Sequence, residues 1–148
     1  MDAVDRALVN ALRMDGRMSF AELSRRVGLS APSVHERVAK LETAGVITGY
    51  HAGVEHAALG YSVSALIGVF LSDDADEQRV ESELREVTEI EDCWFVAGEE
   101  SYVVKVRVTD VPALEHMIGT LNRIRGVART RTTVVLSTKF EDRVQPLD

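Results

Sequence analysis

Polar and apolar residues alternate at helical spacing in three short stretches of the first 45 residues, which predicts three amphipathic helices. The first helix is expected between residues 2 and 15. The second begins at Ser19, whose side chain can form a capping box with Glu22, and it ends at Gly28. Because glycine takes the left-handed conformation past a helix end without a Cβ penalty, this second helix should be about two turns long.

The third helix is expected to begin after Ser30, a good N-cap residue, with Pro32 in its first turn and Gly45 after its end. Its apolar stripe consists of Val34, Val38 and Leu41. A short helix, a tight turn with glycine and a second crossing helix form a helix-turn-helix, whose second helix fits the major groove of DNA. The N-terminal pattern therefore predicts a three-helix DNA-binding unit.

The apolar spacing changes after the third helix. Residues 46–51 contain β-branched and aromatic residues typical of a short strand, and residues 52–60 have the composition of a connector. Further strands are expected at 61–71, 90–97, 102–108 and 129–138, with helices at 75–87 and 111–124 and a tight turn at 98–101. The order βαββαβ predicts a ferredoxin-like fold, in which two helices cover one face of an antiparallel sheet.

These elements predict an α+β chain with two domains, which a length of 148 residues permits. Residues 1–50 would form a three-helix (winged) helix-turn-helix domain, and residues 51–60 a linker. Residues 61–148 would form the ferredoxin-like domain.

Charge is distributed unevenly between these two parts. The whole chain has a formal net charge of −7, which taken alone argues against a nucleic acid partner. Residues 1–50 nevertheless sum to +1, with a local +3 in residues 16–40, whereas residues 51–148 sum to −8. The two parts are therefore expected to have different partners. The ten acidic residues between positions 73 and 92 are interpreted as a solvated helix face with its flanking turns.

Turning the apolar stripe of the third helix inward leaves a polar face that has the character of a DNA-reading surface. Ser33, His35 and Glu36 are predicted to meet base edges, and Arg37 and Lys40 to contact phosphates. Ser30 and Pro32 are also predicted to lie at the DNA, at the helix N-terminus, which offers backbone donors to phosphate. Arg25 and Arg26 on the preceding helix could hold the flanking DNA backbone.

A three-helix module that only packs against another protein is the alternative interpretation of the same segment. In that case the arginines and lysines would be solvated surface residues. Glu36 in the middle of the exposed face counts slightly against phosphate contact, although a carboxylate can accept from the amino group of cytosine.

Two segments carry a more specific pattern, LSAPSVHERVAKLETAGVITGY in the N-terminal part and VAGEESYVVKVRV in the C-terminal part. Together with the order of the elements, they resemble the Lrp/AsnC family of leucine-responsive, or feast/famine, transcription regulators over about residues 2–140. The resemblance implies dimers formed through the C-terminal sheets, further assembly into tetramers or octamers, partly palindromic operators, and a response to small amino acids or related metabolites.

In that family the turn between the second and third strands of the C-terminal domain usually has the pattern GxxD, and the effector lies near it in a cleft between subunits. This chain has GEES, so Gly98 matches and Ser101 replaces the aspartate. The resemblance implies an effector site, for which an ammonium acceptor and carboxylate donors are needed. The residues expected to provide it are Gly98, Glu99, Glu100, Ser101, Tyr102, Thr130 and Thr132. Alternatively, Glu99 and Glu100 are only solvated turn residues.

Other chemistry is expected to be absent. Cys93, the single cysteine, lies in an apolar strand and is predicted to be a small core residue with a raised thiol pKa. Trp94, Phe95 and Tyr102 suggest one aromatic face of the sheet, in the core or at a subunit interface. No catalytic constellation, metal site, cofactor motif or membrane segment is expected, and the acidic N-terminus without an apolar segment indicates a cytoplasmic protein.

The sequence thus predicts a sequence-specific transcriptional regulator that binds double-stranded DNA and responds to an amino acid or related metabolite. Two other functions stay open. One is a DNA-packaging protein of the nucleoid without an effector, and the other is an amino-acid-binding module of a metabolic enzyme that does not bind DNA.

Overall fold

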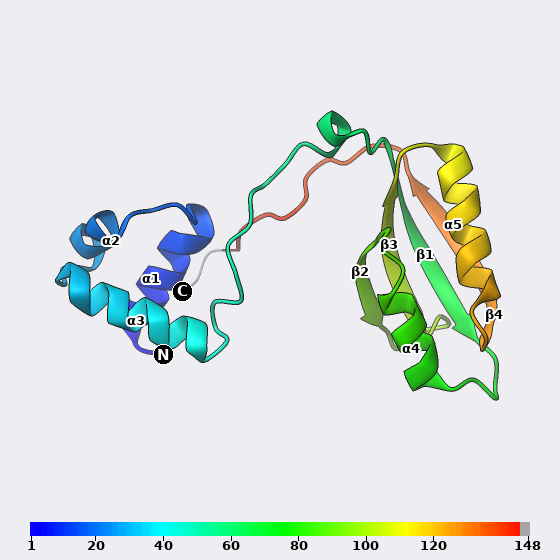
Figure 1. Ribbon diagram of the computed structural model, residues 1–148, viewed down its shortest axis with the longest axis horizontal. Coiled ribbons are helices and arrows are strands. Elements are labelled where there is room, and N and C mark those ends of the chain that lie inside the picture. The colour runs from blue at the N-terminus through cyan, green and yellow to red at the C-terminus, as the bar shows by residue number, and fades with distance from the viewer. Residues whose placement is uncertain (146–148) are drawn as a thin grey trace. The chain divides into compact units, whose positions relative to one another are not determined.

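The computed structural model describes residues 1–145 as two compact units (Figure 1). The first unit comprises Met1–Gly53 together with residues 140–145, and the second comprises Val54–Lys139. Within the described residues, no helix combines the length and the apolarity needed to cross a bilayer.

The first unit contains α1 (Ala3–Met14), α2 (Phe20–Val27) and α3 (Ala31–Thr43). The predicted capping of the last two helices is confirmed: Ser19 and Glu22 form a capping box at α2, and the Ser30 side chain accepts from the Ser33 backbone at α3. The helices enclose a small core of Leu8, Ala11, Leu23, Val34 and Val38. Burying a valine or leucine side chain contributes about 1.5–3 kcal/mol, so this core supplies most of what holds three short helices together.

The turn between α2 and α3 has the geometry that the sequence predicts. Gly28 has φ 69°, the left-handed conformation, and its N–H donates to the Ser24 carbonyl at 2.9 Å. The Ser24 hydroxyl also donates to the Leu29 carbonyl at 2.8 Å, which ties the helix to the residue beyond the turn. These bonds fix the direction in which α3 leaves α2.

The strand predicted at residues 46–51 is wrong, because this segment is irregular and pairs with no strand in the described part of the chain. The N–H groups of Val46 and Ile47 donate instead to the Leu41 carbonyl, at 2.9 and 3.2 Å. The β-branched residues that suggest a strand therefore complete the C-terminal end of α3.

The second unit contains β1 (Val63–Leu71), α4 (Glu77–Arg85), β2 (Ile90–Phe95), β3 (Tyr102–Val108), α5 (Val111–Arg123) and β4 (Val127–Val135), after a 3-10 turn, η1 (His56–Leu59). The strands form one antiparallel sheet in the order β2-β3-β1-β4. This βαββαβ arrangement confirms the predicted ferredoxin-like fold (Figure 1).

Both helices cover the same face of this sheet. Alternate residues of the central strands, among them Ile67, Val69, Val104 and Val106, join Leu84 and Leu121 of the helices in one buried core. We call the opposite face the open face. It carries exposed apolar side chains at Leu66, Trp94 and Val135, which are 40%, 47% and 36% exposed.

Two side-chain predictions for β2 are wrong. Cys93 is exposed rather than part of the core, because β2 lies at the edge of the sheet. Partial desolvation still raises the pKa of its thiol, as expected. Trp94 also does not share a face with Phe95 and Tyr102, because neighbouring residues of a strand point to opposite faces. The rings of Phe95 and Tyr102 meet edge to face at 5.3 Å.

Strand β4 begins and ends earlier than predicted, at Val127 and Val135 instead of 129 and 138. The pairing register explains the shift. Val127 lies opposite Leu71, the last residue of β1, and Val135 lies opposite Ser64, near its first. Residues beyond Val135 therefore have no partner strand to continue the ladder.

Candidate functional site

The exposed face of α3 carries the polar residues that the sequence predicts to meet DNA. Pro32, Ser33, His35, Glu36 and Lys40 are all exposed. The hydroxyls of Ser30 and Ser33 lie 2.9 Å apart, so the N-terminal turn of α3 is held by its own cap. Pro32 has no N–H, and the N–H groups of Ser33 and Val34 donate to Ser30, so the Ala31 N–H and the positive end of the helix dipole are what this end offers to an anion.

Arg37 is directed toward α1. Its Nη1 donates to Asp2 Oδ2 at 2.8 Å and to Asp5 Oδ1 at 2.7 Å. The hydrogen bonds that Arg37 donates to the two carboxylates raise its pKa, and the hydrogen bonds that Asp2 accepts from the Asp5 backbone and from Arg37 lower the pKa of Asp2. This side chain therefore joins α3 to α1.

Lys40 is also paired within the chain. Its Nζ donates to Glu36 Oε1 at 2.7 Å, one helical turn back on the exposed face. The hydrogen bond from Lys40 lowers the pKa of Glu36, so the carboxylate is charged at neutral pH. Both cations predicted to contact phosphate from α3 thus already have an acidic partner.

His35 lies on the other flank of α3, where its ring packs against Phe20 of α2 with centroids 5.0 Å apart. This contact places the imidazole at the junction of the two helices. His35 thus lies on the flank of the face that is predicted to meet DNA.

Arg25 and Arg26 occupy the last turn of α2 and are both exposed. Neither forms an ion pair with another residue in the described part of the chain. Both contribute to lowering the pKa of Glu22, after the larger effect of its hydrogen bonds with Ser19. In contrast to Arg37 and Lys40, these two cations need not leave a carboxylate to bind phosphate.

The acidic residues of the predicted effector turn form ion pairs within the chain. Glu100 forms an ion pair with Arg131 of β4, and Glu99 Oε2 lies 3.7 Å from the same guanidinium. The Glu100 side chain is only 14% exposed and lies so close to Gly68 that a Cβ there would be 2.6 Å from Glu100 Cγ. Both acidic groups of the GEES turn are therefore held by one arginine.

The structure does not bring all predicted effector residues together. Glu100 lies on the open face, whereas Tyr102, Thr130 and Thr132 lie on the helix-covered face, opposite buried or helix-facing residues of β1. The Thr130 hydroxyl donates to Asn122 of α5 at 3.3 Å, and Tyr102 is 4% exposed. The backbone N–H of Ser101 is also used, since it donates to the Val69 carbonyl at 2.9 Å.

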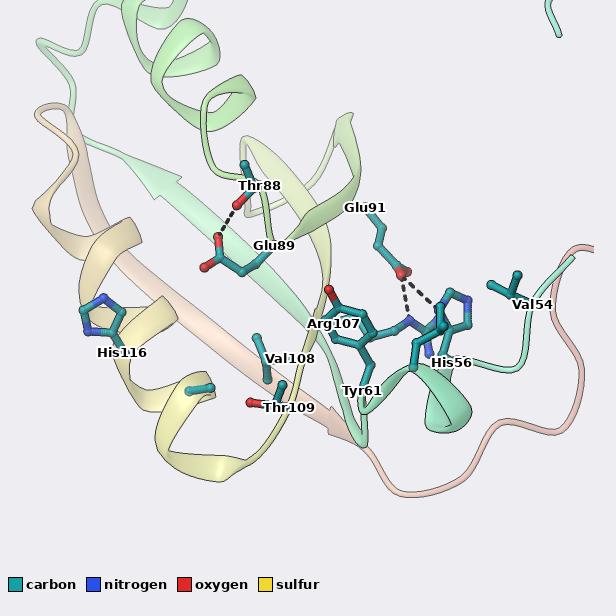
Figure 2. A pocket seen from close by; sticks show the side chains of 12 residues that line it. Val54, His56, Tyr61, Thr88, Glu89, Glu91, Arg107, Val108, Thr109 and His116 are labelled. Carbon is teal, nitrogen blue, oxygen red and sulfur yellow. Dashed lines mark hydrogen bonds and ion pairs between the residues drawn. The ribbon is translucent and has the colours of Figure 1, made fainter. Parts of the chain in front are cut away.

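A different pocket, which sequence reasoning misses, lies at the other end of β3 (Figure 2). It has a volume of about 650 Å³ and is lined by residues from η1, the loop before β2, the end of β3 and α5. In the sequence these residues appear only as a connector, part of an acidic stretch and a helix. No spacing rule links them, because four separate segments form the pocket.

Comparison with known proteins agrees with this architecture. Residues 1–42 match the AsnC-type helix-turn-helix domain, and residues 64–145 match the Lrp/AsnC ligand binding domain. The chain is 42% identical over 145 residues to the HTH-type transcriptional regulator LrpA of Mycobacterium tuberculosis, covering 97% of this chain and 95% of LrpA. It is 38% identical over 139 residues to the leucine-responsive regulatory protein of Escherichia coli, covering 92% of this chain and 85% of that protein.

Solved structures of family members have the same fold as this chain. A crystal structure of Mycobacterium tuberculosis LrpA superimposes with a TM-score of 0.89 at 39% identity, covering 98% of this chain and 99% of that chain. A feast or famine regulatory protein from the same organism, complexed with L-methionine, superimposes with a TM-score of 0.92 at 40% identity and 97% coverage of both chains. With both domains matched and relatives similar over nearly their whole length, this chain belongs to the Lrp/AsnC family of helix-turn-helix transcriptional regulators.

Proposed function

We propose that this regulator reads its operator with α3 and changes its DNA affinity when the second unit binds a small amino acid. The observation that carries the proposal is the α2–α3 geometry: a left-handed Gly28 turn places a polar, exposed helix face beyond a buried apolar stripe. A helix presented in this way fits the major groove.

The contacts of the side chains suggest different roles on DNA. Ser33 and Glu36 are proposed to meet base edges, with His35 beside them at the junction with α2. Arg25, Arg26 and the N-terminal turn of α3, which follows Ser30 and contains Pro32, are proposed to lie at phosphates. Lys40 reaches phosphate only by leaving Glu36, and Arg37 contributes chiefly by fixing α3 on α1.

The second unit is proposed to supply dimerisation and sensing. The open face has exposed Leu66, Trp94 and Val135, and burial of these side chains against a second copy would remove apolar surface from water. A dimer would set two α3 helices against half-sites about 34 Å apart on a partly palindromic operator. Assembly into a tetramer or octamer is proposed as well, on the strength of the family resemblance.

An amino acid is the proposed effector, because a relative of similar sequence and fold is complexed with L-methionine. The effector shifts DNA binding only if it binds one assembly geometry better than another. We propose that the regulator acts in the cytoplasm, on the nucleoid, and needs no cofactor or catalytic chemistry.

Fluorescence anisotropy on a duplex from the region upstream of its own gene, against a scrambled duplex at fixed salt, tests this function. Preference for the upstream duplex that L-methionine or another amino acid shifts would support the regulator. Equal binding to both duplexes without an amino acid effect would favour a packaging protein. Binding of amino acid without binding to any duplex would favour a sensor module.

A further inference from the structure

The pocket at the end of β3 has the volume of a small-molecule site (Figure 2). Its volume of about 650 Å³ lies within the range of roughly 300–1,000 Å³ that is usual for such sites. The turn at residues 98–101 precedes β3, whereas this pocket lies at the other end of the strand. It is therefore a separate place from the turn, where the family resemblance puts the amino acid effector.

One end of the pocket is suited to a carboxylate. The Arg107 side chain is 9% exposed, and its Nε donates to Glu91 Oε1 at 2.6 Å while its Nη1 donates to Ser64 at 3.1 Å. Lys105 Nζ lies 3.4 Å from the second oxygen of Glu91, and His56 Nδ1 lies 3.9 Å from the first. Two cations thus compensate the charge of Glu91, so this residue does not exclude a second anion. A fixed guanidinium beside an imidazole favours a carboxylate ligand.

The other end of the pocket is suited to a cation. Figure 2 shows Glu89 and Thr88 across Val108 from Arg107, with His116 of α5 beyond them. Glu89 is exposed, and its Oε2 accepts from the Thr88 hydroxyl at 3.2 Å. It forms no ion pair with any residue in the described part of the chain, so its charge is compensated only by a neutral hydroxyl and by water.

These two ends point away from each other, although their backbones are neighbours. The Arg107 N–H donates to the Glu89 carbonyl at 3.2 Å. Figure 2 shows the Glu89 side chain directed toward Thr88 and the Arg107 side chain directed toward Glu91. A sphere with the volume of the pocket is about 11 Å across. A free amino acid carries both of its charged groups on one carbon, so it cannot contact both ends at once.

A short peptide separates its two charged groups by a length that depends on its number of residues. Each residue of an extended chain adds about 3.3–3.6 Å, and a charge-assisted hydrogen bond adds about 2.8 Å at each end. With these two bonds, an extended dipeptide spans about 12–13 Å and a tripeptide about 16 Å. The dipeptide therefore matches the width of the pocket, whereas the tripeptide exceeds it.

Apolar groups lie between and around the two charged ends. Val108 is 4% exposed and forms part of the pocket wall, together with Ala113 of α5. Leu59 and Tyr61 line the pocket from the segment before β1 and are 60% and 42% exposed. Apolar side chains of a ligand would cover these two residues and remove their apolar surface from water.

We propose that this pocket binds a dipeptide with apolar side chains, its ammonium at Glu89 and its carboxylate at Arg107 and His56. This ligand is additional to the amino acid effector, so the inference goes beyond the proposed function and does not depend on it. His56, Leu59 and Tyr61 belong to the segment that precedes β1. A bound dipeptide would therefore hold this segment against the sheet.

Isothermal titration of the full chain with L-alanyl-L-leucine tests the proposal. Glu89→Gln should weaken binding by about 10- to 100-fold, because a charge-assisted bond to the ammonium is lost. N-acetyl-L-alanyl-L-leucine lacks the ammonium and should bind weakly, with the same affinity for the wild type and for Glu89→Gln. His56→Gln should weaken L-alanyl-L-leucine but not L-alanyl-L-leucinamide, which lacks the carboxylate. The tripeptide L-alanyl-L-leucyl-L-alanine should bind at least about tenfold more weakly than the dipeptide.

Two further variants test the position of the ligand. Ala113→Leu narrows the pocket without changing its charge and should also weaken dipeptide binding, with a thermal melt to confirm folding. Glu86→Gln removes one exposed charge outside the pocket and should leave dipeptide affinity unchanged.

Glu99→Gln, which removes a carboxylate of the turn, separates this pocket from the amino acid site. If Glu99→Gln weakens dipeptide binding while Glu89→Gln and Ala113→Leu do not, the dipeptide binds at the turn and the proposal is overturned. The proposal also fails if the wild type does not bind L-alanyl-L-leucine. Anisotropy on DNA without peptide tests the proposed function separately.

Discussion

Lys40 donates to Glu36 across one turn of α3, at 2.7 Å, on the face that would enter the major groove. The helix therefore presents a neutralised pair where a free cation would otherwise attract any phosphate. A base that offers a donor to Glu36, such as cytosine, would release Lys40 for the DNA backbone, whereas other sequences would leave the pair intact. We predict that this exchange links base recognition to phosphate binding.

Glu36→Gln should release Lys40 for every sequence. We expect stronger binding to scrambled duplexes, a salt slope steeper by about one unit, and a smaller preference for the operator. Anisotropy at four salt concentrations measures all three. Glu83→Gln removes an acid that is paired with Arg79 four residues away, but in the second unit, and should change none of them. An unchanged slope for Glu36→Gln would refute the exchange.

Removing Arg37 should loosen α3 from α1. Arg37→Ala is expected to lower the melting temperature of the first unit, and Asp5→Ala should do the same because it removes one of the two acceptors. Combining the two changes should cost less than the sum of the single effects, since both break the same contact. Additive losses would show that the two side chains act separately.

The contact between Arg37 and Asp2 should make the stability of the first unit depend on pH in a definite direction. The pKa of Asp2 is lowered in the folded protein from its ordinary value of 3.8, so its stabilising contribution is present above pH 3.8 and is lost as pH falls through the folded value. Asp2→Asn should therefore flatten the acid limb of the melting temperature measured between neutral pH and pH 2. A variant with the same acid limb as the wild type would show that Asp2 contributes nothing.

Gly28→Ala should destabilise the first unit. Gly28 has φ +69°, and a Cβ built there meets nothing within 4 Å, so the cost is conformational rather than steric. We expect about 1–2 kcal/mol, measured by thermal unfolding. Gly53→Ala is the matched control, because its surroundings are equally open and no positive φ is required there. Equal effects at both positions would contradict the proposed role of the turn.

Gly68→Ala probes the turn without altering a charged residue. The added Cβ would lie 2.6 Å from Glu100 Cγ, which must move and so weaken its ion pair with Arg131. If the effector lies beside the turn, as the family resemblance implies, titration with L-methionine should give an affinity weaker by about tenfold or more. The wild-type affinity would place the effector elsewhere.

Much of the fold could be predicted because its signals are local. The pairing of Ser19 with Glu22, the position of Pro32 and the left-handed Gly28 each lie within a few residues of the helix end that they define. The spacing of apolar residues likewise predicted the βαββαβ order. Strand ends were predicted less well, because the end of β4 depends on where β1 begins, some 70 residues earlier in the chain.

The candidate sites depend on contacts that no local pattern contains. Arg37 pairs with Asp2, 35 residues away, and Arg131 pairs with Glu100, 31 residues away. The sequence therefore predicted which residue types face outward on α3, but not that two of its cations are already paired. The pocket at the end of β3 was missed for the same reason. The pairing of β2 with β3 is what brings Glu89 beside Arg107, whose backbone N–H donates to the Glu89 carbonyl.

The most direct test of base reading by α3 is the operator preference of Ser33→Ala, measured by anisotropy on a duplex enriched from a random pool by the wild type. If Ser33 contacts a base edge, the ratio of operator to scrambled affinity should fall about 5- to 150-fold with scrambled binding unchanged. Ser82→Ala, on exposed α4, should keep the wild-type ratio. An unchanged ratio for Ser33→Ala, or an equal loss on both duplexes, would contradict the claim that this face of α3 reads sequence.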